Sequence, residues 1–536
     1  MDPHRRSLIK GAGAGLAAAT VATAGAQPAG PPSAPTGAEH TFDVRRFGAT
    51  GDGRTVDSPA INRAIAAAAA AGGGTVVFPA GTYASYSIRL RSFVALALDA
   101  GATILAAPTP LEGTTTGGYD AAEPQGAWEP YQDYGHNHWH NSLLWGEDLQ
   151  HVAIVGSGMI WGKGLSRGHD TDRDLPNTTR PGVGNKAIAL KNCRNVLLRD
   201  FSILQGGWFG LLATGVDNLT IDNLTIDTNR DGVDIDCCRN VHVSNCTVNS
   251  PFDDGICPKS SYALGYARAT ENVTITNCYV TGDFEVGTVL DGTFRRRPAS
   301  QHATATGRIK FGTESNGGFL NITVANCVFE SCRGFALETV DGARLEDVTI
   351  TNVTMRDLRN SPLFLRLGAR MRGPAGAAPG TLRRVLIRNL TSYGAVAMPS
   401  IITGVPGQMI EDVSLDGLHL HQVGGGTREM AMREPPELER AYPEPGTFGD
   451  IPATGLFARH VHNLSVSNVD VVTESADARP AFWLADVNGA DFFRIRAPRS
   501  AAQGPAFSLQ GVRDFRVFGS RGVPDTTLDA ADRRTV

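Results

Sequence analysis

Three aspartates in the middle of the chain have the types and spacing for acid–base chemistry. Asp253 lies 22 residues after Asp231, and Asp254 follows directly. An acid that protonates a leaving oxygen and a carboxylate that activates water are the two groups that hydrolyse a glycosidic bond. Because Asp253 and Asp254 are adjacent, repulsion between their charges is expected to raise the pKa of one of them. One acid alone is better explained as a solvated turn residue, so the hypothesis depends on what brings the three together.

A repeat of much the same length surrounds these aspartates. Short β-branched strands begin at polar residues such as Asn195, Asn218 and Asn240, with no helices between them. This pattern predicts an all-β fold, a solenoid of parallel strands or parallel β-helix, in which residues of equal phase stack about 4.8 Å apart. Counting thirteen residues on from successive anchors puts four side chains in one column, which we interpret as a functional cleft: Trp208, Asp231, Asp253 and Glu285.

Composition fits a solenoid and argues against some functions. The 536 residues include 62 glycines, and the net charge of −5 comes without any basic run, which argues against a nucleic-acid partner. The eight cysteines show no zinc-binding spacing, and we assign no disulfide. Four of them follow an asparagine at a similar strand phase and are expected to stack as small core residues: Cys193, Cys246, Cys278 and Cys327.

Both ends of the chain differ from the repeat. Residues 1–26 have the pattern of a twin-arginine export signal, with Arg5-Arg6 before a weakly apolar run that ends in small residues. Residues 27–39 are rich in Pro, Gly and Ala and are predicted to be a disordered leader. These features predict a periplasmic or secreted protein without a membrane anchor. Residues 526–536 are predicted to be a mobile tail.

Residues 40–525 are expected to form a single β-helix domain. Its first part, residues 42–106, is predicted to be a cap, because Ser58-Pro59 is a typical helix start and a helix would plug the open end of the solenoid. Three insertions interrupt the repeat, at residues 108–141, 283–306 and 429–450. We expect the first two to wall off one end of the groove.

The first insertion ends in three histidines at alternate positions, His136, His138 and His140, with Trp139 among them. On a strand these imidazoles face one side, so a metal site is one interpretation. A wall of aromatic and imidazole rings for stacking sugars is the other, and we favour it. No metal and no cofactor is predicted.

The aspartate motifs resemble those of the polygalacturonase family, glycoside hydrolase family 28. Asn229-Arg230-Asp231-Gly232 is similar to the family's Asn-Thr-Asp-Gly, and Phe252-Asp253-Asp254 to its Gly-Asp-Asp, with Lys259 shortly after. The similarity spans about residues 40–480 and includes the Trp208 turn and Tyr442-Pro-Glu-Pro. The resemblance implies a right-handed β-helix that hydrolyses with inversion. It further implies that Asp253 is the general acid and that Asp231 and Asp254 activate water.

The chain departs from the family pattern at two places. The family's Gly-His-Gly should lie on the coil after Asn272, where this chain has Gly307-Arg308 instead, and His302 in the insertion could substitute for the histidine. The family's Arg-Ile-Lys, which grips a sugar carboxylate, should come one coil later, at residues 336–338. The literal Arg308-Ile309-Lys310 is therefore one coil early.

Acidic residues near these places also distinguish the chain from the family. Glu314, Glu338 and Asp341 are either turn residues in solvent or part of a site more acidic than galacturonate binding requires. With a cation pair still lining the cleft, an acidic sugar stays a reasonable substrate. The predicted substrate-binding residues are Lys259, Arg308, Lys310, Glu285, Glu314, Glu338, Trp208, His136, His138 and Trp139.

Three functions are compatible with these observations. The first is an exported, exo-acting and inverting glycosidase of a pectic polysaccharide, a divergent exo-acting or rhamnogalacturonan-type relative of the family. The second is a polysaccharide lyase, in which the aspartates hold Ca²⁺ and Arg308 or Lys310 is the base. The third is a carbohydrate-binding β-helix without catalysis. We favour the first, with a polysaccharide or oligosaccharide as the partner in each case.

Overall fold

The computed structural model describes residues 40–108, 118–166, 178–498 and 503–536. Residues His40–Val536 form one compact unit, so the expected single domain extends to the last residue. The proposed export signal and leader lie outside the described residues. None of the described helices combines the length and apolar character needed to cross a membrane.

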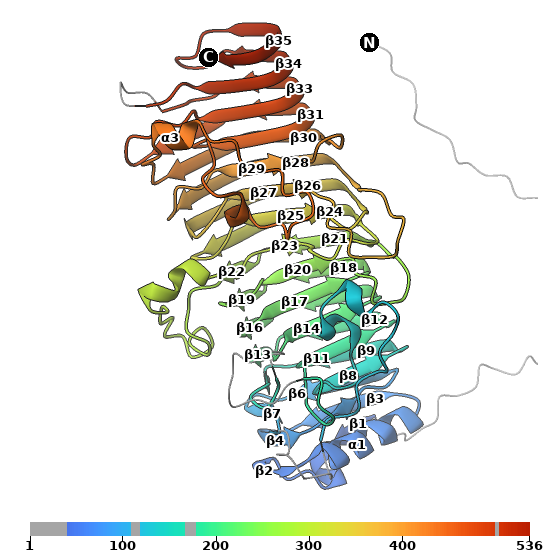
Figure 1. The fold of residues 1–536 in the computed structure, drawn as a ribbon. Coiled ribbons are helices and arrows are strands. Elements are labelled where there is room, and N and C mark those ends of the chain that lie inside the picture. The colour runs from blue at the N-terminus through green and yellow to red at the C-terminus, as the bar shows by residue number, and fades with distance from the viewer. Residues whose placement is uncertain (1–39, 109–117, 167–177, 499–502) are drawn as a thin grey trace, which may run out of the picture. The chain divides into compact units, whose positions relative to one another are not determined.

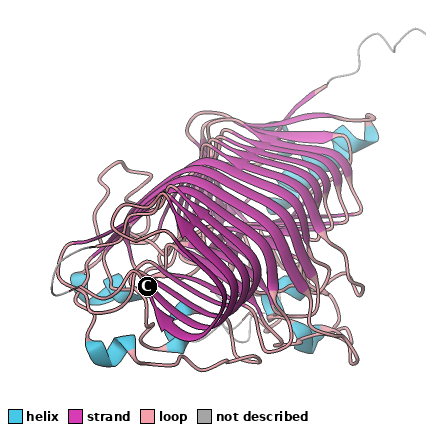
Figure 2. Cartoon of the chain, turned by 90° about the horizontal axis from the view of Figure 1, so that it is seen from above, coloured by secondary structure: helices cyan, strands magenta, loops and turns pink. Residues whose placement is uncertain are grey.

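The chain winds as a parallel β-helix whose coils stack along one axis (Figures 1 and 2). One coil contains β14, β15 and β16, the next β17, β18 and β19, and the next β20, β21 and β22, and equivalent strands pair in parallel. Alternate residues point inward: Leu219 and Ile221 of β15 are buried while Thr220 and Asp222 between and beyond them are not. The predicted solenoid is therefore confirmed.

The strands of the first half have the following bounds: β1 (Thr41–Asp43), β2 (Asp52–Val56), β3 (Gly74–Phe78), β4 (Gly81–Ser85), β5 (Ile88–Arg89), β6 (Val94–Leu98), β7 (Ala102–Ala106), β8 (Leu144–Glu147), β9 (Gln150–Val155), β10 (Met159–Trp161), β11 (Ile188–Lys191), β12 (Arg194–Arg199), β13 (Ser202–Leu204), β14 (Phe209–Thr214), β15 (Asp217–Asp222), β16 (Thr225–Asp227), β17 (Asp231–Asp236), β18 (Arg239–Ser244), β19 (Thr247–Asn249), β20 (Ile256–Lys259), β21 (Thr270–Thr276) and β22 (Tyr279–Thr281).

In the second half many strands run on through the turn: β23 (Lys310–Phe311), β24 (Phe319–Glu330), β25 (Phe335–Thr339), β26 (Arg344–Leu358), β27 (Leu363–Leu367), β28 (Thr381–Gly394), β29 (Ser400–Thr403), β30 (Ile410–Gln422), β31 (Leu456–Ser467), β32 (Asp470–Thr473), β33 (Phe482–Phe493), β34 (Phe507–Phe518) and β35 (Thr526–Thr535). Helical segments are few and short apart from α1: η1 (Val44–Phe47), α1 (Ser58–Ala70), η2 (Glu129–Tyr131), α2 (Tyr134–Asn137), η3 (Ala299–Thr304), α3 (Arg428–Ala431) and η4 (Pro445–Phe448).

The predicted capping helix is α1, which starts at Ser58 with Pro59 in its first turn. Its buried face, with Ile61, Ala64 and Ile65, packs against the first coils. Asp57, just before it, accepts hydrogen bonds from the backbone N–H of Thr50 and Gly51 and so ties the helix to the preceding turn. The first coil thus presents a helix instead of an open sheet edge.

The polar residues that mark the repeat occupy a special backbone conformation. Asn195, Asn218 and Asn240 have φ of 57°, 56° and 58°, in the left-handed region that asparagine tolerates better than most residues. Their side chains form a ladder across the coils: Nδ2 of Asn218 donates to Oδ1 of Asn195 (2.8 Å), and Nδ2 of Asn240 to Oδ1 of Asn218 (2.7 Å). The ladder fixes the turn at the same place in each coil.

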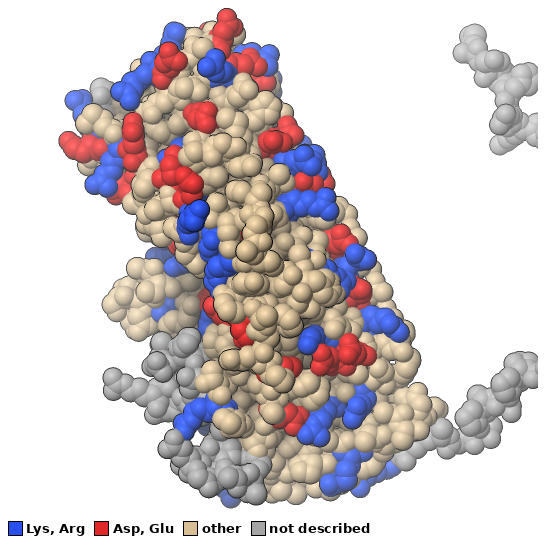
Figure 3. Space-filling view, turned by 45° about the vertical axis from the view of Figure 1, so that its right-hand side comes forward, with Lys and Arg blue, Asp and Glu red and all other residues tan. Residues whose placement is uncertain are grey.

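The cysteines are part of the interior. All eight are buried and free, including the four predicted to stack in the core. Of the adjacent pair, Cys238 belongs to the main core cluster and Cys237 contacts Asp236 and Ser261 outside it. On the face shown in Figure 3, acidic and basic side chains are interspersed along the stack, as expected for a small net charge.

The predicted mobile tail is wrong. Residues Thr526–Thr535 form β35, which pairs with β34 in the antiparallel sense, while the other named pairings of the structure are parallel. An antiparallel strand can follow its neighbour through a short turn, and it covers the edge that the last coil would otherwise expose. The sequence of β35 is polar and alternates weakly, so it lacked the β-branched signature of the repeat.

Replacement of Asn218 tests the ladder. We expect Asn218→Ala to lower the free energy of unfolding by about 1–3 kcal/mol, because alanine is strained at positive φ and two amide hydrogen bonds are lost. Asn218→Gly removes the same hydrogen bonds without the backbone strain and should cost less. Urea denaturation followed by circular dichroism measures both, and an alanine variant as stable as the wild type would contradict this account.

Candidate active site

The outward-facing side chains of one sheet are polar over three consecutive coils and apolar on either side of them. Neighbouring strands align Ala189 with Leu212, Leu212 with Asp234 and Asp234 with Cys257. The pairing of Ile256 with Ile309 then aligns Cys257 with Lys310, and Lys310 pairs with Ala336. From there the same column continues through Phe364, Ile401, Phe457 and Trp483. The polar stretch Asp234–Cys257–Lys310 therefore lies between two apolar stretches.

Inserted loops cover both apolar stretches. Trp139 of the first insertion packs in a buried cluster with Ala189 and Leu212, joined by Tyr134 and Trp145. Phe448, at the end of the third insertion, and Ile451, just after it, pack in a second cluster with column residues from Ala336 to Trp483. The loops thus dock where the sheet is apolar and leave the polar stretch between them as the candidate site.

The three aspartates meet at the edge of this stretch. Asp231 begins β17, while Asp253 and Asp254 lie in the turn before β20, and one carboxylate oxygen of each lies within 4.8 Å of the others. The backbone N–H of Asp254 donates to Oδ1 of Asp231 (3.1 Å) and of Asp253 (3.1 Å). Asp253 is the most accessible, with 29% of its side chain exposed against 3% and 5% for Asp231 and Asp254.

The predicted column of Trp208, Asp231, Asp253 and Glu285 is wrong in register. β14 and β17 pair Phe209 with Asp231, and the alignment of Val233 with Ile256 places Asp254, not Asp253, beside Asp231. Glu285 lies on the second insertion with its side chain 45% exposed and paired with Arg295. Counting thirteen residues from each anchor failed because the turns before β17 and β20 differ in length by one residue. It failed for Glu285 because the second insertion begins before the chain reaches the next strand of this sheet.

Cations hold two of the three carboxylates ionised. Nε of Arg308 lies 2.8 Å from Asp254 and Nζ of Lys310 lies 3.3 Å from it, while Arg230 lies 2.8 Å from Asp253. Burial opposes the charge of Asp254, but Lys310 and Arg308 outweigh it and lower the pKa of this carboxyl. Arg230 likewise lowers the pKa of Asp253 against burial.

Of the three carboxyl groups, Asp231 is the one whose pKa is raised. Burial, with the charges of Asp253 and Asp234, raises the pKa of Asp231 well above its ordinary value. We expected repulsion to raise the pKa of Asp253 or Asp254, which is wrong because the cations beside those two residues offset it. A hydrogen bond with Asp231 also lowers the pKa of Asp253.

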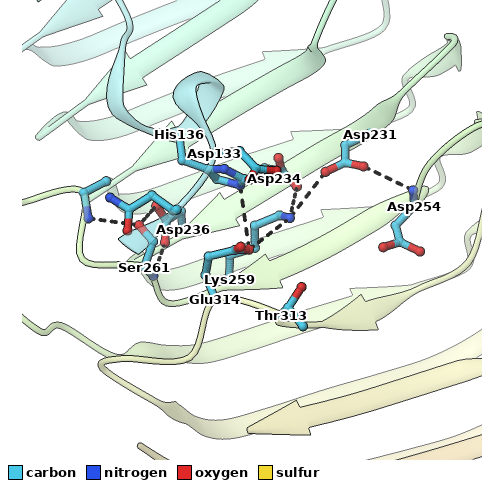
Figure 4. Close-up of polar contacts among 12 residues, drawn as sticks. Asp133, His136, Asp231, Asp234, Asp236, Asp254, Lys259, Ser261, Thr313 and Glu314 are labelled. Carbon is cyan, nitrogen blue, oxygen red and sulfur yellow. Dashed lines mark hydrogen bonds and ion pairs between the residues drawn. The ribbon is translucent and has the colours of Figure 1, made fainter. Parts of the chain in front are cut away.

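A second cluster of charges surrounds Lys259 (Figure 4). Its Nζ lies 3.3 Å from Asp231, 3.5 Å from Glu314 and 3.8 Å from Asp234. Burial raises the pKa of Asp234 to about 7, whereas Lys259 outweighs burial at Glu314 and lowers its pKa well below the usual range. His136 lies 3.9 Å from Glu314, and burial lowers the pKa of this imidazole to about 4, so it is neutral near pH 7.

The count of coils around Arg308 and Lys310 is confirmed. β23 lies on the coil directly after β20, and Lys310 pairs with Ala336 on the next, so residues 336–338 lie where the family's Arg-Ile-Lys was expected. Glu338 there is fully buried, 3.8 Å from Nζ of Lys310, and burial raises its pKa to about 7. Glu314 and Asp341 are buried as well, so none of the three acids is a solvated turn residue.

The histidine-rich segment is not a strand. His136 lies in the short helix α2, and the three imidazoles have different partners: Glu314 for His136, Glu129 for His138 and Glu147 for His140. They therefore do not share one face. His138 is 1% exposed, stacked on Tyr134, and Trp139 and Trp208 are each 2% exposed. These rings support the loop, and their proposed contact with sugar stays a prediction.

His302, the proposed substitute for the family's histidine, contacts Arg297 and Asp283 rather than the three aspartates. Nε2 of His302 bonds to the carbonyl of Arg297 (2.8 Å) and lies 3.4 Å from Asp283. The histidine that contacts the charged site is therefore His136, which belongs to the first insertion.

The structure adds residues that we did not predict. Arg230, Asp234, Tyr442 and Glu444 all contact the charged cluster: Tyr442 Oη lies 3.0 Å from Lys310, and Glu444 lies 2.9 Å from Arg308. The alternation of Val233 and Ile235 with Asp234 could have shown that this acid faces outward. Nothing local could have placed Glu444, which arrives from a loop more than 130 positions later in the chain.

Three sets of described residues bring three potential metal ligands together, and a cation neighbours each. Lys191 lies 2.8 Å from the Glu123–His140–Glu147 set, Lys259 contacts the Asp231–Asp234–Cys257 set, and Arg308 contacts the three aspartates. A bound metal ion would have to displace or face these charges. We therefore assign no metal to these residues.

Removal of Lys259 tests the charge balance. Lys259→Met should destabilise the protein by about 3–5 kcal/mol at pH 7, because three buried acids lose their cation. The lowered pKa of Glu314 contributes stability above pH 4.5, its value when unfolded, and this contribution is lost as pH falls. In urea denaturation the deficit of the variant should therefore stay nearly constant down to about pH 4.5 and shrink as the pH falls further.

Lys191→Met is the matched control, because Lys191 pairs with Glu147 at a more exposed position and lies over Trp139. This change should cost about 1 kcal/mol. Equal losses in the two variants, or a deficit of Lys259→Met that grows as the pH falls below about 4.5, would contradict the assignment.

Comparison with known protein families matches two parts of the chain. Residues 41–132 match a model described as rhamnogalacturonase A/epimerase, pectate lyase-like, and residues 161–296 match one described as a right-handed β-helix region. The predicted handedness is thereby confirmed.

Two proteins and two solved structures are similar to the chain at low identity. A probable polygalacturonase of Vitis vinifera is 24% identical over 60% of this chain and 62% of its own length, and an exo-poly-α-D-galacturonosidase of Dickeya chrysanthemi is 26% identical over 41% and 34%. The chain thus spans less than two thirds of either relative. Family 28 exopolygalacturonases of Yersinia enterocolitica and Thermotoga maritima share the fold, with TM-scores of 0.60 and 0.54 at 17% and 18% identity, over 86% and 81% of this chain and 79% and 92% of theirs. The chain is therefore a distant homologue of polygalacturonases and exopolygalacturonases, built on a right-handed β-helix.

Proposed function

We propose that the protein is an exo-acting, inverting glycosidase that releases sugars from the end of a pectic oligosaccharide. The observation that carries this proposal is the short polar stretch between two loop-covered apolar stretches. From Asp234 to Lys310 it spans two strand spacings, about 10 Å. A polar stretch of this length, with a loop docked on each side of it, fits a chain end better than the middle of a polymer. The names of the relatives point to the same chemistry.

In this proposal Asp253 is the general acid, and Asp231 and Asp254 activate water. The greater exposure of Asp253 supports its role, because the acid must reach the leaving oxygen of a bulky substrate. The two cations on Asp254 support a carboxylate that stays ionised and accepts a proton from water. Their contacts favour a structural role for Arg308 and Lys310 within the site, so binding of a substrate carboxylate by this pair stays a prediction.

In this proposal the catalytic proton resides on Asp231 in the free protein, because the pKa of Asp231 is raised and that of Asp253 is lowered. It passes along the hydrogen bond to Asp253 before the glycosidic bond breaks. Asp253 then gives it to the leaving oxygen, and Asp231, now ionised, orients water together with Asp254. At turnover the water proton returns to the cluster, so its charge is restored.

The separation of the carboxylates makes the stereochemistry an experimental question. Their nearest oxygens lie within 4.8 Å, less than the roughly 6.5–9.5 Å between carboxyl groups typical of inverting glycosidases. Inversion is supported here by the resemblance to family 28 and by the ion pairs of Asp254, which engage both of its oxygens and make it a poor nucleophile.

Export is part of the proposal and is supported by the sequence alone. The Arg5-Arg6 pair and the small residues near position 26 fit a protein carried out of the cytoplasm by a twin-arginine signal. A location outside the cytoplasm would bring it to plant polysaccharide fragments.

Asp253→Asn tests the acid. We expect at least about a hundredfold loss of kcat on a galacturonate oligosaccharide, because the amide cannot donate a proton at the required acidity. The thermal midpoint should change little, since the side chains are nearly isosteric. Asp291→Asn, an exposed acid of the second insertion, is the control and should keep full activity. Retained activity in Asp253→Asn would remove Asp253 from the mechanism.

The products test exo action and inversion together. A polymeric pectic substrate should release monomer or dimer from the first minutes, while the size of the remaining polymer, measured by size-exclusion chromatography, stays nearly constant. Early-time proton NMR should show the anomer opposite to the bond cut. A rapid fall in polymer size would refute exo action, and retention would require a covalent intermediate. Ultraviolet absorbance of an unsaturated product would instead identify a lyase.

A further inference from the structure

We propose that Arg230 and Phe252 form a subsite for an acidic sugar beside Asp253, and that Arg230 recognises the carboxylate of that sugar. This inference rests on the proposed glycosidase function and adds the residues that set its preference for a charged substrate. Arg230 replaces the threonine of the family's Asn-Thr-Asp-Gly motif, and Phe252 replaces the glycine of its Gly-Asp-Asp motif. Both side chains therefore distinguish this chain from the family pattern.

Arg230 is the most accessible of the four cations that pair directly with the three aspartates. Its side chain is 23% exposed, compared with 2% for Arg308, 3% for Lys310 and 7% for Lys259. Those three each contact two or three protein carboxylates: Asp254 and Glu444 for Arg308, Asp254 and Glu338 for Lys310, and Asp231, Asp234 and Glu314 for Lys259. Their charge is therefore largely neutralised within the protein, whereas Arg230, which pairs with Asp253, keeps a more accessible guanidinium.

Arg230 is also preorganised. Its guanidinium lies over the Trp208 ring, 4.9 Å from the ring centre, and the Trp208 ring is itself packed under Gly135 and near Tyr134 of the first insertion. Stacking on an aromatic ring keeps a guanidinium flat while its edge stays available for the two oxygens of a carboxylate. The first insertion thus supports the Trp208 ring that positions Arg230.

Phe252, directly before Asp253 in the chain, provides an exposed apolar platform. Its ring is 50% exposed, which is rare for a phenylalanine in this structure, and Arg297 of the second insertion lies 4.5 Å from the ring centre. The apolar face of a sugar ring stacks on such a platform. An acidic sugar with its ring near Phe252 and its carboxylate at Arg230 would have its glycosidic oxygen near Asp253.

Binding of the carboxylate would also prepare the acid. Asp253 is surrounded by Arg230, Asp231, Asp254 and Lys259. When the substrate shares the guanidinium, Asp253 loses part of the attraction that keeps it ionised and accepts the proton of Asp231 more readily. The preference for an acidic substrate should therefore appear in catalysis as well as in binding.

The test compares an oligogalacturonide with its carboxyl-reduced, neutral counterpart. Arg230→Gln should raise KM for the acidic substrate about 10- to 100-fold and change KM for the neutral one by no more than about twofold. Phe252→Ala should raise both values by a similar factor, since stacking does not sense charge. Arg230→Lys should keep part of the preference. Arg295→Gln and Phe294→Ala, exposed positions of the second insertion, are matched controls and should behave as the wild type.

A pH profile separates this role from a structural one. Without Arg230 the pKa of Asp253 rises, so the basic limb of kcat/KM for the neutral substrate should move to higher pH in Arg230→Gln. Equal losses on both substrates, or an unchanged pH profile, would overturn the inference. Calorimetric binding of the two ligands to wild type and Arg230→Gln gives the same comparison without turnover. A protein that hydrolyses neither ligand but loses selective binding in the variant would disprove the glycosidase and keep the subsite.

Discussion

The register between coils is the constraint on which the site depends. Parallel hydrogen bonding leaves no freedom for one coil to slide on the next without moving its outward residues inward. The asparagine ladder, with each turn at positive φ, repeats that register at the corner of each coil. As a result, Asp231 and Asp254 are neighbours through the backbone alone, before any side-chain contact forms, and the N–H of Asp254 binds the carboxylate of Asp231.

The same register decides where loops can lie. Outward side chains at one phase make a column, and its apolar members need a cover, which the first and third insertions supply. The loops therefore do not close over the site by chance. They stop where the column turns polar, because Asp234 and Lys310 offer nothing for an apolar loop to bury. The length of the polar stretch is therefore set by the residues of the column rather than by the loops.

Much of this could be predicted from the sequence, for identifiable reasons. The β-helix, the capping helix and the burial of the cysteines follow from period and composition, which act locally. The three aspartates could be found because the motifs are local too. The register could not be counted to the residue, since a single extra residue between Asp231 and Asp254 shifts the column and an insertion separates Asp254 from Arg308. Tyr442 and Glu444 reach the site from a distant loop whose path depends on packing, and packing is not a local property.

The position of the cations explains why recognition should lie elsewhere than in the resembling family. Arg308 and Lys310 stand one coil closer to the aspartates than the family pattern has them, and at that distance they bind Asp254. Glu338 occupies the position they leave, buried and next to Lys310. Because Arg308 and Lys310 pair with protein carboxylates and Glu338 stands at the family's cation position, recognition of an acidic substrate needs another cation. In the proposal made above that cation is Arg230, which replaces a neutral residue of the resembling motif and lies on Trp208. Under that proposal the displaced pair and the added arginine are two parts of one change, since the positive charge moved toward Asp254 is accompanied by a second positive charge beside Asp253.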